Sequence, residues 1–170
     1  MNYLSIGTPT DRLAFAVFED LRLKAYGDKL FSFTDIIYQS KETFEAIKSI
    51  IRANNIDIVV VKWIDYYRLK KGSAFDIIAF RSLIRLACAT YNCIYLEVES
   101  YGWEKYILKE GKENKIDIIN KGYGIDLKNN PLVHKDDQES VADAIMLGEA
   151  IAHQRLTAKP RQPINYKWGE

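Results

Sequence analysis

The pattern of apolar and polar positions predicts three strands at the start of the chain. Residues 3–6 form a short apolar run that stops at the turn signal 7–11, Gly-Thr-Pro-Thr-Asp. Residues 13–18 then read Leu-Ala-Phe-Ala-Val-Phe, and residues 22–33 alternate loosely around Gly27-Asp28. Apolar segments separated by short turns favour an antiparallel meander of three strands.

Helical and strand periods alternate after this meander. Apolar side chains at helical spacing predict helices over 40–54 and 74–89. The run 56–61, β-branched at every position except Asp57, is typical of a strand buried on both faces, and residues 93–98 predict a further strand.

Three further helices are expected beyond these strands. Residues 103–108 and 116–120 indicate two short helices. The last helix, 141–152, is apolar nearly all round except for Asp143 and Glu149, which indicates that it is packed on most sides.

The order of elements predicts an α/β fold. Three antiparallel strands, followed by parallel strands joined through crossover helices, give a mixed five-stranded sheet flanked by helices, which is the RNase H-like arrangement. We expect one such domain over residues 1–156 and a polar C-terminal tail over 157–170, which contains two prolines. At 170 residues the chain suits a single domain with one core.

The net charge and the lack of long apolar segments limit the kinds of partner that the protein can bind. The net charge is +1, so a nucleic acid would have to be held by a local basic patch and not by the chain as a whole. No window approaches about 18 apolar residues, and the N-terminus carries no basic leader, so we expect a cytoplasmic protein without a membrane partner.

Three stretches resemble the RuvC-type Holliday junction resolvases, in an order that covers most of the chain. Residues 4–9, Leu-Ser-Ile-Gly-Thr-Pro, stand where that family has an apolar strand ending in Asp before a turn. Residues 59–63, Val-Val-Val-Lys-Trp, stand where it has a strand ending in Glu. Residues 140–145, Ser-Val-Ala-Asp-Ala-Ile, are similar to its Asp-x-x-Asp-Ala motif and give the most specific match.

The resemblance implies a divalent-metal nuclease site that this sequence largely lacks. Two Mg²⁺ or Mn²⁺ ions about 3.5–4 Å apart need several converging carboxylates. The family's acidic positions fall here on Gly7, Lys62 and Ser140, and only Asp143 matches. A lysine also places a positive charge where a cation should bind.

Asp143 is costly to bury without a partner because Ala142, Ala144 and Ile145 surround it in an apolar helix. Lys62 is a candidate partner. We therefore hypothesise a structural Lys62–Asp143 ion pair in place of the lost metal, which a large separation between the two residues would exclude.

Relocated carboxylates form the competing hypothesis. Catalytic candidates are Asp143, Glu139, Asp65 and Asp11, with Glu97 or Glu99 on the following strand, and an active enzyme would hold Mg²⁺ or Mn²⁺ through Asp143, Glu139 and Asp65. Glu139 and Asp143 at i, i+4 share a helix face. Acidic residues such as Asp136, Asp137 and Glu139 also stabilise a helix N-terminus whatever the function. Without relocation we expect no cofactor.

Two basic and aromatic segments are candidates for nucleic-acid binding. The first contains Tyr66, Tyr67, Arg68, Lys70 and Lys71, a mixture suited to phosphates and unstacked bases. The second contains Lys105, Lys109, Lys112 and Lys115, although interleaved glutamates also fit a solvated helix face.

Three functions remain open from the sequence. The leading one is a RuvC-like nucleic-acid-binding protein with a degenerate active site that recognises branched or distorted DNA, or a protein partner. The second is an active metal-dependent junction resolvase with relocated carboxylates, and the third is a structural or regulatory dimer that does not bind nucleic acid. The resemblance implies a homodimer.

Overall fold

The computed structural model describes residues 1–7, 12–31, 36–63, 71–99 and 114–152. The strands are β1 (Asn2–Ile6), β2 (Arg12–Glu19), β3 (Arg22–Leu30), β4 (Ile58–Trp63) and β5 (Ile94–Glu99). The helices are α1 (Ile36–Asn54), α2 (Lys71–Tyr91), α4 (Lys115–Tyr123) and α5 (Gln138–Ala152), with a short 3₁₀ helix η2 (Lys135–Asp137) directly before α5. No described helix has the length and apolar character needed to cross a membrane.

The predicted five-stranded mixed sheet is confirmed. Its strand order is β3-β2-β1-β4-β5. β1 and β3 each pair with β2 in antiparallel fashion, whereas β4 lies parallel between β1 and β5. This is the expected RNase H-like α/β arrangement, and it places the C-terminal ends of the neighbouring strands β1 and β4 at the same edge of the sheet.

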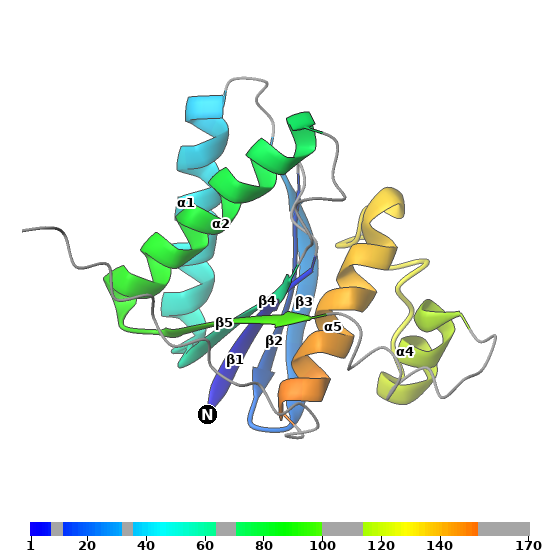
Figure 1. Cartoon of the computed structure of the whole chain (residues 1–170). Coiled ribbons are helices and arrows are strands. Elements are labelled where there is room, and N and C mark those ends of the chain that lie inside the picture. The colour runs from blue at the N-terminus through cyan, green and yellow to red at the C-terminus, as the bar shows by residue number, and fades with distance from the viewer. Residues whose placement is uncertain (8–11, 32–35, 64–70, 100–113, 153–170) are drawn as a thin grey trace, which may run out of the picture.

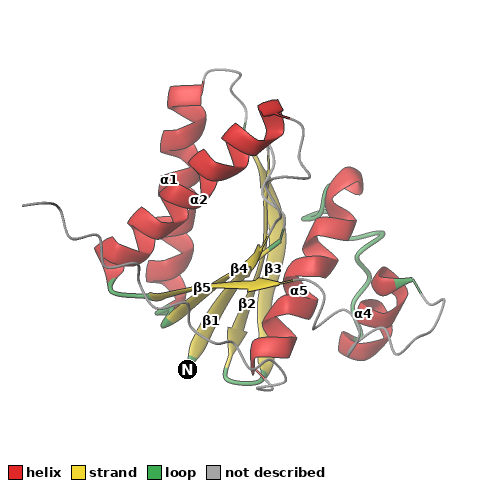
Figure 2. Ribbon diagram, viewed as in Figure 1, coloured by secondary structure: helices red, strands yellow, loops and turns green. Residues whose placement is uncertain are grey.

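Helices cover both faces of the sheet (Figures 1 and 2). α1 and α2 lie on one face, while α5 lies on the other, with α4 packed on its outer side. The inner strand β4 is buried from both sides, because Val60 joins the core under α5 and Val59 and Val61 join the core under α1 and α2. The continuous β-branched run 59–61 follows from this double burial.

Small residues allow α5 to lie very close to the sheet. The Ser5 hydroxyl on β1 donates a 2.6 Å hydrogen bond to the carbonyl oxygen of Ala144. A Cβ added at Gly148 would overlap the ring of Phe18 on β2. Ala144 and Ile145 are fully buried, so the prediction that this helix is packed on most sides is confirmed.

Several predicted boundaries were wrong by a few residues. α1 begins at Ile36 and not at 40, α2 extends over Lys71–Tyr91, and α5 begins at Gln138 because η2 leads directly into it. β3 ends at Leu30, short of the expected 33. The predicted helix over 103–108 and the proposed tail over 157–170 lie outside the described residues.

Candidate functional site

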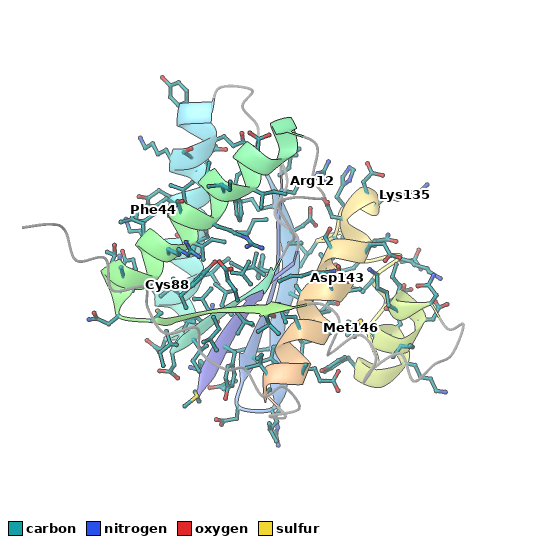
Figure 3. All side chains as sticks on the ribbon, in the orientation of Figure 1. Arg12, Phe44, Cys88, Lys135, Asp143 and Met146 are labelled. Atoms are coloured by element: carbon teal, nitrogen blue, oxygen red, sulfur yellow. The ribbon has the colours of Figure 1, made fainter. Side chains whose placement is uncertain are left out.

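Three elements bring the family-matched positions together. Gly7 directly follows β1, and the parallel pairing of Ile6 with Val61 places it beside Lys62 near the end of β4. α5 crosses the same edge of the sheet and carries Ser140 and Asp143 in its first turns. Figure 3 shows Asp143 and Met146 on the α5 side of the sheet, opposite Cys88 and Phe44.

Lys62 and Asp143 form the hypothesised ion pair. The Lys62 Nζ atom lies 3.0 Å from Asp143 Oδ2. Both side chains are largely buried, with 17% of Lys62 and 9% of Asp143 exposed. Because a buried carboxylate needs a partner, this ammonium group explains how Asp143 is tolerated in an apolar helix.

A second lysine completes the cluster. Lys115, the first residue of α4, places its Nζ atom 2.8 Å from Asp143 Oδ1 and 2.6 Å from Glu139 Oε2. Each oxygen of the Asp143 carboxylate therefore contacts its own ammonium group. We call Lys62, Lys115, Glu139 and Asp143 the ion cluster; two cations and two anions make its formal charge zero.

The end of β1 leaves no room for a side chain at Gly7, where the resemblance expects an aspartate in the family. A Cβ added at this residue would overlap the carbonyl oxygen of Ser140, so the backbone of α5 fills the space that a side chain would need. The Gly7 N–H donates a 3.0 Å hydrogen bond to the carbonyl oxygen of Ala14 on β2, which fixes the strand end. An aspartate at position 7 would require α5 to move.

Arg81 supports the cluster from the opposite face of the sheet. This α2 guanidinium has a side chain only 2% exposed and donates a 2.6 Å hydrogen bond to the carbonyl oxygen of Lys62. That bond comes from Nη2, and the Nη1 atom lies 3.3 Å from Glu97 Oε2. The end of β4 that carries Lys62 is thus held by a buried side chain.

Glu97 is not brought to Asp143. It pairs in register with Val61, whose side chain faces α1 and α2, whereas Asp143 lies on the other face. Its Oε1 atom accepts hydrogen bonds from Arg85 and the Tyr95 hydroxyl, both at 2.7 Å. Burial, together with this bond to Glu97, raises the pKa of the Tyr95 phenol.

Asp137 has a structural partner in addition to its place at a helix start. Its Oδ2 atom lies 2.8 Å from Arg12 Nη1, and Asp28 Oδ2 lies 3.8 Å from the same nitrogen. Burial raises the pKa of Asp137; the Arg12 charge opposes this rise, and the Asp28 carboxyl adds to it. This arrangement ties η2 to β2 and β3.

The described residues do not form a carboxylate metal site. No group of three His, Cys, Asp or Glu side chains among them is placed to hold an ion. Glu139 and Asp143 do share a helix face, as predicted, but the group between them is the Lys115 ammonium. In this part of the chain the residues do not fit a two-metal centre, and no catalytic step through a metal follows from them.

The remaining predicted site residues lie outside the described part of the chain. These are Asp11, Asp65, Tyr66, Tyr67, Arg68, Lys70, Lys105, Lys109 and Lys112. Lys71 is the first residue of α2, and its side chain, like that of Glu99, is also outside the description.

Sequence reasoning missed the roles of Lys115 and Arg81. Lys115 had been grouped with a basic run as a possible nucleic-acid contact, but its ammonium group contacts Glu139 and Asp143. The two acids Glu139 and Asp143 at i, i+4 indicated a need for more positive charge than Lys62 supplies, but nothing in the sequence identified Lys115 as its source. Arg81 gave no comparable signal.

Comparison with solved structures places the fold beside the junction resolvases. RuvC of Thermus thermophilus in complex with a Holliday junction substrate matches with a TM-score of 0.73 at 14% identity, over 94% of this chain and 99% of RuvC. The yeast mitochondrial Holliday junction resolvase Ydc2 matches with a TM-score of 0.61 at 8% identity, over 91% of this chain and 84% of Ydc2. No protein-family model and no curated protein sequence matches. The chain therefore has the RuvC-like resolvase fold.

Proposed function

We propose that this chain is a RuvC-like protein that binds branched DNA and in which the ion cluster replaces the catalytic metal centre. Two findings support the DNA partner: the fold agrees with RuvC over nearly the full length of both chains, and that RuvC structure holds a Holliday junction substrate. Because fold alone does not establish activity, the composition of the site decides the proposed chemistry.

The observation that carries this proposal is the double pairing of Asp143. A divalent cation at this carboxylate would have to displace Lys62 and Lys115, or lie within a few ångströms of two positive charges. Two like unit charges 4 Å apart repel by about 4 kcal/mol at an effective dielectric constant of 20. The two lysines therefore neutralise Asp143 without a metal ion, and this edge of the sheet needs no Mg²⁺ to fold.

The two basic segments proposed to contact DNA are joined in sequence to the ion cluster. Residues 64–70, which include Tyr66, Tyr67 and Arg68, follow directly after Trp63, next to Lys62. Residues 100–113, which include three of the candidate lysines, end just before Lys115. We propose that both segments bind DNA phosphates and unstacked bases beside the cluster.

The exposed face of α2 supports the homodimer that the resemblance implies. Ile78 and Leu86 lie eight residues apart on this helix with exposed fractions of 49% and 55%, and exposed Ser82 lies between them on the same face. We propose that a second copy of the chain covers this face. Burial of Ile78 and Leu86 at such an interface would favour association through the hydrophobic effect.

Leu86→Glu should prevent this dimer, because the substitution places a charge in an apolar interface. Light scattering coupled to size exclusion should give a dimer for the wild type and a monomer for the variant. Leu132→Glu is the matched control, since Leu132 is 71% exposed in the segment before η2 and away from α2. A monomeric wild type, or a variant that stays dimeric, would contradict the proposal.

Binding to a four-way junction, compared with a linear duplex of the same arm sequence, tests the proposed function. In EDTA we expect at least tenfold tighter binding to the junction, an affinity that falls with rising salt, and no cleavage when Mg²⁺ or Mn²⁺ is added. Metal-dependent cleavage abolished by Asp143→Asn would instead support an active resolvase with relocated carboxylates. Salt-insensitive or absent DNA binding would support a structural dimer.

A further inference from the structure

A groove of about 580 Å³ lies on the sheet face opposite the ion cluster. Leu13 and Phe15 of β2 and Lys29 of β3 line one side, and Tyr38, Lys41 and Glu42 of α1 line the other. The groove thus lies between α1 and the strands β2 and β3.

The lining combines ring surfaces with cations. The Tyr38 side chain is 57% exposed, and the partly buried Phe15 lines the same groove. Lys29 and Lys41 are exposed, and neither forms an ion pair with a described residue. This mixture suits a planar ring attached to an anion.

Neither acidic residue of the groove is paired with Lys29 or Lys41. Glu45 is already paired with Lys48, whose Nζ atom lies 3.0 Å from its carboxylate. Glu42 Oε2 accepts no hydrogen bond within the described part of the chain. A side-chain rotation would let this carboxylate accept from the N–H groups that bases carry on their pairing edges.

Lys29 lies near the edge of the sheet that carries the ion cluster. Lys29 pairs in register with Leu13, and the adjacent residue Ala14 accepts the backbone hydrogen bond of Gly7. A DNA strand at that edge can therefore reach the groove by passing around the end of β2 and β3.

We propose that this groove binds an unstacked nucleotide of single-stranded DNA, with the base against Tyr38 and Phe15 and the phosphates beside Lys29 and Lys41. The inference rests on the proposed DNA-binding function and adds to it a second, base-accepting site. Frayed arms or gaps next to a junction would present such nucleotides.

Binding of a fluorescently labelled octathymidylate to the full chain tests the site. Tyr38→Leu should weaken binding about tenfold, whereas Tyr38→Phe should retain it, because stacking needs the ring and not the hydroxyl. Lys41→Ala should flatten the slope of log Kd against log salt by about 0.7, the value for one phosphate contact on a single strand. Lys24→Ala, at the other end of β3 and paired with Glu19, is the control and should change neither quantity.

The same preparations should be tested on a fully paired four-way junction, which separates the two proposals. Junction binding together with octathymidylate binding that Tyr38→Leu leaves unchanged would overturn only the groove, and would leave a protein segment or a second copy of the chain as its occupant. Loss of both kinds of binding in the wild type at low salt would overturn the DNA-binding function and the groove with it.

Discussion

Each oxygen of the Asp143 carboxylate contacts a lysine ammonium, so the carboxylate is held from both sides. The pair with Lys62 is largely buried, so solvent screens it less than a surface pair. Removing one partner of such a pair leaves an uncompensated charge, and that loss typically costs more than the pair itself contributes.

We expect a double-mutant cycle of Lys62→Met and Asp143→Asn to give a coupling free energy of about 1–3 kcal/mol in urea unfolding. Lys115 remains beside Asp143 and limits the value. The surface pair Lys128–Asp117, with side chains 52% and 59% exposed, is the control and should couple by less than about 1 kcal/mol. Equal coupling in the two cycles would show that the Lys62–Asp143 pair is no stronger than a surface pair.

Gly7 is constrained by contact and not by backbone conformation. Gly7→Ala should lower the free energy of unfolding by about 1–3 kcal/mol, because the new Cβ meets the carbonyl oxygen of Ser140 and must displace α5. Gly122→Ala is the matched control: a Cβ there meets nothing within 4 Å, and alanine favours the helix α4. If Gly7→Ala left the free energy of unfolding unchanged, α5 would not lie against this strand end.

At the scale of elements, Arg12, Asp28 and Asp137 join β2, β3 and η2. The pKa of Asp137 is raised, so the stability that its protonated form contributes is present at acid pH and is lost as pH rises through that pKa. The stability of the wild type relative to Asp137→Asn should therefore fall from about pH 4 towards neutrality.

Asp126→Asn provides a control of opposite sign. Hydrogen bonds from Asn129, the largest contribution, lower the pKa of Asp126, so wild-type stability relative to this variant should rise with pH. Thermal unfolding at several pH values measures both differences. The same direction of change in the two variants would contradict the assignment of a raised pKa to Asp137.

The elements themselves were largely predictable from sequence, because local patterns specify them. The run 56–61 indicated a strand buried on both faces, and the apolar surroundings of Asp143 indicated a buried partner. Lys115 could not be assigned, since its distance from Asp143 depends on how α4 packs against α5. The contact between Gly7 and Ser140 depends likewise on how closely α5 lies on the sheet, which small residues at Ser5, Ala144 and Gly148 permit.

The molecule as a whole combines a RuvC-like fold with a sheet edge at which lysines stand beside the family-matched carboxylate Asp143 in place of metal ions. In a two-metal nuclease, carboxylates gather cations from solution. Here Lys62 and Lys115 bring the cations on the chain itself, and the backbone of α5 occupies the space beside Gly7. This difference predicts DNA recognition that does not depend on divalent metal.

A crystal structure of the full chain soaked in Mn²⁺ tests this central claim most directly, because anomalous scattering locates the ion. We predict no manganese at Asp143, with Lys62 Nζ still about 3 Å from its carboxylate. Manganese bound by Asp143 together with Glu139, Asp65 or Asp11, with Lys62 displaced, would contradict the account and establish a metal centre built from relocated carboxylates.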